Sequence, residues 1–298
     1  MNPLHNADIY MIKGTKCLNR TFIYNLFYMD DTTAAEYFEK AGNIYVIHNK
    51  CIEASNSFIK SAEQQPDTYN EAKMYIKAGK ATISNEHKIM LYNKAIQLYI
   101  ELGKLKECGD LSLLIGNLYT MDSIYSIDSY LLASTYYCDY PIKSIHCLHK
   151  VAEIYSNQGE MFKAAVIYEQ ILKTYDSKSN LYSYIITSVI YKCIICYMAS
   201  DDLVTTNNKL LEFKSTYNTI FVDSREYTFI YELLHCMTTH DADAFSKCTH
   251  AYYNITKITP LITSILLCCK RLIIINTQDE DEDEYVDEDE YVDEEDLT

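Results

Sequence analysis

Apolar residues recur every three or four positions along most of the chain, the spacing that places side chains on one face of an α-helix. The first clear example is residues 34–45, where one face of the expected helix carries Ala34, Tyr37, Phe38, Ala41 and Tyr45. In residues 72–78, small and aromatic side chains again share a face. Seven glycines and four prolines in 298 residues leave few sites for tight turns. The pattern therefore predicts an all-α protein.

The helical pattern repeats along the chain. Four similar segments mark the repeat: KAGNIY at 40–45, KAGKAT at 77–82, LIGNLY at 114–119 and KVAEIY at 150–155. They stand at intervals of 37, 37 and 36 residues, and further amphipathic segments lie between them. Small residues at one level of a helix let a neighbouring helix approach closely. We predict a tetratricopeptide-like stack of antiparallel helical hairpins at residues 30–199, forming a curved right-handed solenoid.

The repeat fades near residue 200, where four further helical segments begin. Asp223 or Ser224 is expected to cap the second of them, Asp241 the third, and Pro260 to open the fourth. We predict a C-terminal helical bundle at residues 200–278 that also covers the open end of the stack.

The end of the chain carries most of its negative charge. Residues 279–296 contain fourteen acids and no base, so the net charge of −16 reduces to 28 acids against 26 bases, or −2, elsewhere. A segment so rich in like charge cannot bury enough surface to offset the entropy of ordering. We predict a disordered acidic tail at 279–298, which either aids solubility or meets a basic partner.

Eleven cysteines raise the question of disulfides or a metal site. Cys193 and Cys196 form a C-x-x-C pair, but they lie in the apolar run VIYKCIICYM with no second pair nearby, so we expect them to fill the core. The sequence contains no nucleotide-binding, hydrolase or zinc-protease motif. We expect no catalytic residue, metal or cofactor, and a chain that is not an enzyme.

A membrane-spanning helix is not predicted. The longest apolar stretch, LITSILLCCKRLIII, is interrupted by Lys270 and Arg271. It is also shorter than the ~20 residues that span a bilayer. Membrane contact is therefore expected to be peripheral.

An apolar segment, FIYNLFYM at 22–29, ends the N-terminal region, which we place at residues 1–29 as a helix followed by a loop. Lys13, Lys16 and Arg20 precede it. Two interpretations are open at this point: a helix end packed into the core, or an exposed tip that enters a bilayer or a partner's groove.

Four segments together resemble the soluble NSF attachment proteins of the α-SNAP type, over nearly the whole chain. They are TFIYNLFYMDDTTAAEYFEKAGNIY, CLHKVAEIYSNQGEMFKAAVIYEQI, DSREYTFIYELL and the closing DEEDLT. Their order and spacing carry the resemblance, and the chain looks like a divergent member of that family.

The resemblance implies an adaptor in vesicle-mediated transport and membrane fusion. Such proteins bind the four-helix SNARE complex left after fusion and recruit the AAA+ ATPase NSF, which disassembles it. The implied location is cytoplasmic and peripherally membrane-associated, with no nucleic-acid partner.

The resemblance also implies roles for particular residues. Membrane contact falls on Phe22, Ile23, Leu26 and Phe27. SNARE binding falls on Lys104 and Lys150. NSF binding falls on Asp293, Glu294, Glu295, Asp296 and Leu297.

The chain departs from the family pattern at several positions. Two family lysines align with Asp110 and His146, and acids that the family turns toward NSF align with Thr238 and Thr239. Such changes alter charge complementarity and therefore partner choice. Two alternatives stay open: a helical-repeat scaffold for another protein target, and a mimic that binds SNAREs without productive NSF stimulation.

Overall fold

All regular secondary structure that the structure describes is α-helical. The computed structural model describes residues 3–18, 33–120, 123–175 and 183–286, with side chains in the last range from 184 to 277. By contacts between residues, the chain divides into two units, 1–147 and 148–298. The all-α prediction is confirmed within the described ranges.

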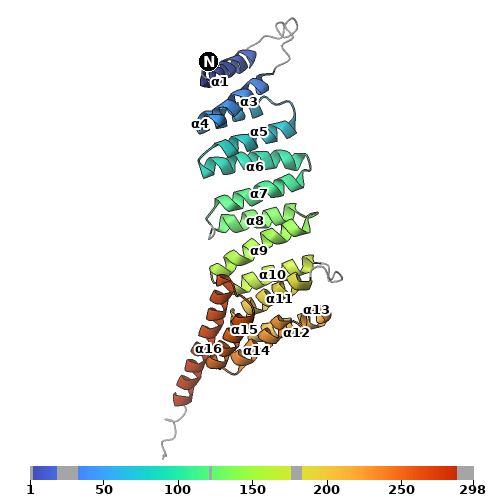
Figure 1. Cartoon of the computed structure of the whole chain (residues 1–298), viewed down its shortest axis with the longest axis vertical. Coiled ribbons are helices and arrows are strands. Elements are labelled where there is room, and N and C mark those ends of the chain that lie inside the picture. Colours follow the sequence, from blue (N-terminus) through green and yellow to red (C-terminus); the bar gives the residue numbers. More distant parts are fainter. Residues whose placement is uncertain (1–2, 19–32, 121–122, 176–182, 287–298) are drawn as a thin grey trace, which may run out of the picture. The chain divides into compact units, whose positions relative to one another are not determined.

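The first unit is a series of antiparallel helices joined by short connections (Figure 1). Its helices are α1 (Pro3–Leu18), α3 (Ala34–Ile47), α4 (Cys51–Ala62), α5 (Thr68–Ala81), α6 (Asn85–Glu101), α7 (Leu105–Leu118), α8 (Ile124–Tyr136) and the beginning of α9 (Pro141–Asn157). Helices α3, α5, α7 and α9 begin at residues 34, 68, 105 and 141, which are 34, 37 and 36 residues apart. The predicted tetratricopeptide-like series of hairpins is therefore confirmed.

Polar side chains determine where several of these helices begin. Thr33, Asp67 and Ser84 each accept a hydrogen bond from the backbone N–H three residues later, at 3.3, 3.0 and 3.3 Å. A cap of this kind contributes ~1 kcal/mol. Between helices, Asn49 and Gly103 turn the chain in the left-handed region, with φ of 56° and 65°.

Glycines let an aromatic ring of the second helix lie directly on the first helix of the same hairpin. The pairs are Gly42 with Phe58, Gly79 with Tyr92, and Gly116 with Tyr130. A Cβ atom built at these glycines would lie 2.8, 2.5 and 2.6 Å from the ring, closer than real Cβ atoms approach. The three glycines are 37 residues apart. These three repeats thus have glycine at this position because a larger side chain would collide with the aromatic ring.

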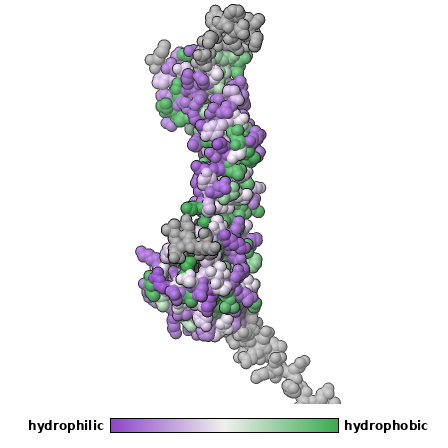
Figure 2. All heavy atoms as spheres, turned by 90° about the vertical axis from the view of Figure 1, so that its right-hand side faces the viewer, coloured by the Kyte–Doolittle hydropathy of each residue, from purple (hydrophilic) through white to green (hydrophobic). Residues whose placement is uncertain are grey.

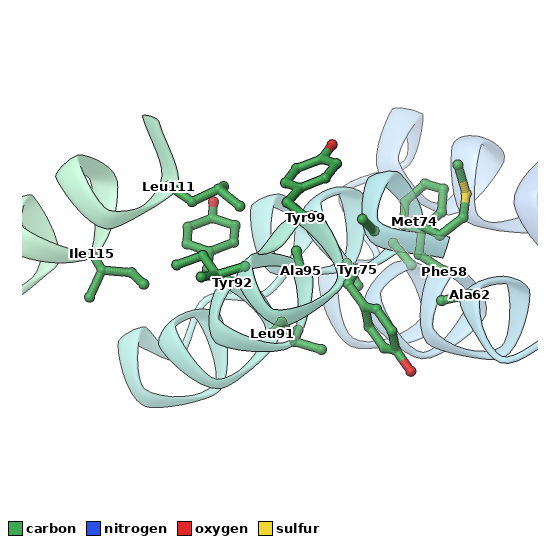
Figure 3. Close-up of a cluster of buried hydrophobic side chains, with 14 of the residues drawn as sticks. Phe58, Ala62, Met74, Tyr75, Leu91, Tyr92, Ala95, Tyr99, Leu111 and Ile115 are labelled. Atoms are coloured by element: carbon green, nitrogen blue, oxygen red, sulfur yellow. The ribbon is translucent and has the colours of Figure 1, made fainter. Parts of the chain in front are cut away.

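A continuous apolar core joins the central helices of the first unit (Figure 3). Its labelled members are Phe58, Ala62, Met74, Tyr75, Leu91, Tyr92, Ala95, Tyr99, Leu111 and Ile115. On the face seen in Figure 2, hydrophobic and hydrophilic residues are interspersed over this unit. The unit therefore buries its apolar residues between helices and leaves an outer surface of mixed character.

The second unit is built around α11 (Ser183–Met198). Around it lie α10 (Met161–Thr174), α12 (Leu203–Thr216), α14 (Arg225–Thr238) and α16 (Pro260–Val286), each in contact with α11. The remaining helices are α13 (Asn218–Phe221) and α15 (Ala242–Ile255). Because α11 packs against α10 as well as against the later helices, the predicted boundary at residue 199 does not coincide with the division at 147/148.

The cysteines of α11 are part of this core. Cys193 and Cys196 are fully buried, and the Cys193 thiol lies 3.4 Å from the Ala165 carbonyl oxygen. Burial raises the pKa of both thiols well above the ordinary value for cysteine. The prediction that this C-x-x-C pair fills the core is confirmed.

The predicted helix starts in this unit are also confirmed. Ser224 and Asp241 cap α14 and α15 by accepting backbone hydrogen bonds of 3.1 and 2.7 Å, and the structure adds a cap by Asp202 on α12 at 2.8 Å. Pro260 opens α16. Proline suits the first turn of a helix because the backbone N–H that it lacks would have no hydrogen-bond partner within the helix there.

Helix α16 differs from expectation in two ways. By length and composition alone, Pro260–Thr277 could cross a membrane, although the sequence predicted no such helix. Ile265, Cys269 and Ile273 are among the 28% of this segment that is buried. The helix also continues to Val286, into the stretch for which we predicted disorder, while residues 287–298 lie outside the described residues.

Candidate functional site

The exposed side of α5 carries three lysines in a row. The buried residues of α5 are Ala72, Met74, Tyr75, Ala78 and Gly79. Lys73, Lys77 and Lys80 therefore lie on the opposite side, at spacings of four and three residues that keep them on one face. The local sequence places three positive charges along about two helical turns.

These lysines border a groove of about 620 Å³ between α3 and α5. It is lined by Glu36, Glu39, Gln65, Asn70, Lys73, Met74, Ile76, Lys77 and Lys80. Three lysines against two glutamates leave the groove with a net charge of +1. Met74 and Ile76 add apolar surface, so the site offers both charge and hydrophobic contact.

The three lysines differ in how far their charge is compensated. The Lys77 ammonium lies 2.6 Å from Glu39 Oε1 and joins α5 to α3. Lys73 lies over the Tyr69 ring, 4.3 Å from its centroid. Among the described residues, no carboxylate forms an ion pair with Lys73 or Lys80. These two side chains are available for charge-assisted hydrogen bonds to carboxylates of a partner.

Lys104, predicted to bind SNAREs, is exposed but lies elsewhere. It stands at the N-cap of α7, where its backbone N–H donates to the Tyr99 carbonyl oxygen at 2.8 Å. It is not among the residues that line the α3–α5 groove. One repeat earlier, the equivalent residue is Asp67, the N-cap of α5, so Lys104 does not share the register of the lysine row.

Lys150, the other predicted SNARE-binding residue, is half-buried on α9 and belongs to residues 148–298. The intervals of the sequence repeat give it the same register as Lys40 and Lys77. Lys150 is therefore equivalent by repeat to a residue of the groove, although it lies in the other unit.

Asp110 occupies a position where the resemblance places a lysine. It accepts hydrogen bonds from the Tyr137 hydroxyl at 2.7 Å and from the Lys143 ammonium at 2.6 Å. Burial raises the pKa of Asp110, but the hydrogen bonds from Lys143 and Tyr137 outweigh burial and hold the pKa below its ordinary value. The result is an internally compensated ion pair that links α7 to α9.

The end of α14 is neutral where the resemblance places acids. The hydroxyls of Thr238 and Thr239 both donate to the His235 carbonyl oxygen at 2.9 Å. Thr238 also lines a groove of about 460 Å³ that includes Val204 and Tyr231. Both side chains contribute internal hydrogen bonds and no charge at this helix end.

The other predicted site residues lie outside the residues that the structure describes. They are Phe22, Ile23, Leu26 and Phe27 for membrane contact, and Asp293, Glu294, Glu295, Asp296 and Leu297 for NSF binding. Lys73, Lys77 and Lys80 were missed by the sequence argument. Superposing the repeats and marking the residues between the buried positions would have found them.

Comparisons with known proteins agree with one another. The family model described as "Soluble NSF attachment protein, SNAP" matches residues 5–274. The beta-soluble NSF attachment protein of Bos taurus is 26% identical over 253 residues, covering 80% of this chain and 83% of the relative. The alpha-soluble NSF attachment protein of Mus musculus is 26% identical over 264 residues, covering 84% and 86%.

Two further comparisons are with a yeast protein and with a solved structure. The alpha-soluble NSF attachment protein of Saccharomyces cerevisiae is 25% identical over 260 residues, covering 84% of this chain and 87% of the relative. The crystal structure of C. therm. Get4 covers 90% of this chain and 89% of its own, with 12% identity and a TM-score of 0.30, too low a similarity to assign a function. The sequence relatives confirm the resemblance drawn from the four segments.

Proposed function

We propose that this chain, which belongs to the soluble NSF attachment protein family, binds post-fusion SNARE complexes at membranes and recruits and stimulates an NSF-type AAA+ ATPase. Family membership and its relatives support a SNAP-type role in vesicle fusion. The observation that carries the SNARE assignment is the row of lysines on α5, beside a groove with both charged and apolar walls.

Electrostatics gives this face a physical reason to bind an acidic helical bundle. Carboxylates along a partner helix would form charge-assisted hydrogen bonds with Lys73 and Lys80. Complementary charge of this kind raises the association rate and fixes the alignment of the partner helix. It adds less to the binding affinity. We also propose that Lys104, at the N-cap of α7, and Lys150, on α9, contact the SNARE complex.

Two further contacts complete the proposed adaptor. Phe22, Ile23, Leu26 and Phe27 would enter the membrane that carries the SNARE complex and raise its effective concentration. The acids at 293–296 and Leu297 would meet a basic face of the ATPase. The proposed location is accordingly cytoplasmic, with peripheral attachment to membranes.

One observation favours a second candidate function, a chain that binds SNAREs or another target without productive stimulation of NSF. Thr238 and Thr239 bring no charge to the end of α14, where the family places acids toward NSF. A protein that keeps the SNARE-binding face but lacks this contact would hold the complex without promoting its disassembly.

A reconstitution separates these possibilities. SNARE complexes are immobilised, the purified chain is added, and NSF is supplied first with a non-hydrolysable ATP analogue and then with ATP. The adaptor proposal expects NSF to be retained with the analogue and the SNAREs to be released with ATP. Retention of the chain without NSF would support the second candidate, and retention of neither would refute both.

The membrane contact is tested in the same assay with SNAREs on liposomes and in solution. Phe22→Ser together with Phe27→Ser should slow disassembly on liposomes and leave the soluble reaction nearly unchanged. An equal loss in both reactions would instead show that these side chains pack into the core.

A further inference from the structure

A second groove lies in the other unit, between α15 and α16. Its volume is about 320 Å³. Its walls are Phe245, Ser246, Thr249, His250, Tyr253, Ile258, Thr263, Leu266, Leu267 and Lys270. Rings and aliphatic side chains from both helices therefore face a common channel.

The hydroxyl groups in this groove do not need a ligand. Ser246 donates to the Ala242 carbonyl oxygen at 2.8 Å, Thr249 to that of Phe245 at 2.9 Å, and Thr263 to that of Thr259 at 3.2 Å. Because each hydroxyl bonds within its own helix, an apolar side chain could fill the groove without leaving these groups unpaired. These three hydroxyls therefore leave the groove's apolar character unchanged, and its other polar side chains are His250, Tyr253 and Lys270.

The groove lies in a locally basic stretch, residues 242–277, although α16 continues beyond it into six acids at 279–284. Between Ala242 and Thr277 the bases are Lys247, Lys257, Lys270 and Arg271, and the acid is Asp243, which gives 4 − 1 = +3. The whole chain carries −16. Lys270 lines the groove itself and Arg271 follows it on α16. A ligand with carboxylates beside an apolar ridge would match this charge distribution.

Helix α16 also leaves apolar side chains uncovered along its length. Leu267 is 51% exposed, and Ile274 and Ile275 are 42% and 51% exposed. Leu267, Lys270 or Arg271, and Ile274 follow one another at three- and four-residue spacings, so they form one stripe on the helix. Exposed apolar stripes bordered by charge are typical of helix-binding surfaces.

We propose that the α15–α16 groove binds an acidic amphipathic helix of a partner protein, with an aliphatic side chain in the groove and carboxylates facing Lys270 and Arg271. This partner surface is separate from the lysine row of the first unit and does not depend on the function proposed for it. A concave channel between two helices suits a ridge of side chains better than it suits a bilayer, whose contact favours protruding apolar groups.

The chain's own acidic tail is a poorer occupant. Residues 279–284 are all acidic, and α16 continues through them to Val286. Among residues 287–298 the aliphatic side chains are Val292 and Leu297. They are five residues apart, so they do not share a ridge at the three- and four-residue spacing of an amphipathic helix.

The test uses two synthetic helical peptides of about 20 residues, roughly 30 Å of helix. Both carry leucine at helical spacing, one with glutamate and one with lysine on the polar face. Fluorescence anisotropy at physiological salt should show that the glutamate peptide binds the full-length chain and that the lysine peptide binds at least about tenfold more weakly, as charge complementarity requires.

Matched variants locate the site. Leu267→Asp should weaken binding of the glutamate peptide by about tenfold or more, as loss of a buried anchor does. Leu211→Asp is the control, because Leu211 is 55% exposed on α12 of the same unit and lies outside the groove. Lys270→Glu with Arg271→Glu should reverse the preference in favour of the lysine peptide.

Several outcomes would overturn the proposal. Binding that survives Leu267→Asp, or is lost equally in Leu211→Asp, would place the peptide elsewhere. Binding of the glutamate peptide only after removal of residues 287–298 would assign the groove to the chain's own tail. Sedimentation with anionic vesicles that Leu267→Asp abolishes, without binding of either peptide, would make α16 a membrane contact.

Discussion

Gly79 lies where the Tyr92 ring of α6 meets the backbone of α5. Glycine to alanine within a helix ordinarily stabilises by ~1 kcal/mol. Here the added Cβ would lie 2.5 Å from Tyr92 Cε1. We expect Gly79→Ala to lower the free energy of unfolding by ~1–3 kcal/mol, the cost of overpacking a core, as measured by urea denaturation followed by circular dichroism.

Two comparisons isolate the ring contact. Lys80→Ala, on the next and exposed position of α5, should leave the free energy of unfolding nearly unchanged. Tyr92→Leu should reduce the additional cost of Gly79→Ala, because the shorter side chain leaves room for the methyl group. A stable Gly79→Ala chain would show that α5 and α6 can separate without loss.

Asp110 is a carboxylate whose ionisation the fold changes. Its folded-state pKa is depressed below the unfolded value, so its ion pair stabilises the folded chain above the unfolded pKa of ~3.9 and loses that effect as pH falls through the folded pKa. Lys143 and Asp110 are both nearly half exposed, so the contribution is at most ~1 kcal/mol.

Asp110→Asn tests this sign. The variant should unfold at a lower urea concentration than the wild type at pH 7, and the difference should shrink as pH falls through the folded pKa of Asp110, where the wild-type carboxylate becomes neutral. Urea midpoints at pH 7 and at a series of acid pH values measure it. A difference that grows at low pH would contradict the assigned direction.

At the scale of the element, the face of α5 is the part of the first unit most suited to an acidic helix. Lys73→Glu, Lys77→Glu and Lys80→Glu together replace three positive charges with three negative ones. We expect the affinity for an acidic SNARE bundle to fall by more than about tenfold at low salt, and less at high salt, because salt screens the interaction. Surface plasmon resonance at two salt concentrations measures both effects.

The matched control reverses three lysines at or on α4 and α6, the second helices of two hairpins. Lys50, Lys60 and Lys94 are exposed lysines at the start of α4, on α4 and on α6. Their reversal to glutamate should reduce SNARE binding much less than reversal on α5. Equal losses would mean that overall charge, and not the α5 face, governs the interaction.

The hairpins were predictable because the spacing of apolar residues and the recurring small residue identify the buried face of each helix. Gly42, Gly79 and Gly116 mark positions that must be small, and their period of 37 residues fixes the start of successive helices. The lysine row was not predicted, because lysines scattered in the sequence share a face only after the register of each helix is known. Lys104 shows the same limit, since its alignment with a family lysine does not reveal that it stands at the N-cap of α7.

At the scale of the whole molecule, the proposed function requires the lysine row and the tail to act on different partners. Leu297 is the one strongly apolar side chain after Val292. Leu297→Ala should leave SNARE binding unchanged and lower the stimulation of NSF ATPase activity, because the tail would keep its charge and lose its apolar contact. ATP turnover with SNARE complexes present measures this, and unchanged stimulation would reduce the tail to a solubilising role.

The limits of the larger units were harder to predict from the sequence. The fading of the repeat near residue 200 suggested a boundary there, but α11 packs against α10 and against α12, α14 and α16 alike. The core around α11 depends on contacts between residues distant in the chain, and the local spacing of apolar residues does not predict such contacts. Helix α16 ends at Val286, eight residues into the acidic stretch that begins at residue 279, because a helix can continue from an apolar segment into charged residues.

The rings that lie on Gly42, Gly79 and Gly116 have a consequence for how the first unit opens. Each contact joins the two helices of one hairpin, so a hairpin can retain its own closure while it separates from its neighbours. Backbone amides should therefore exchange with solvent in groups, α3 with α4 and α5 with α6, each group sharing one opening free energy. The smallest cooperative part of this unit would then be the hairpin, and deuterium uptake followed by mass spectrometry would show steps at residues 62–68 and 101–105.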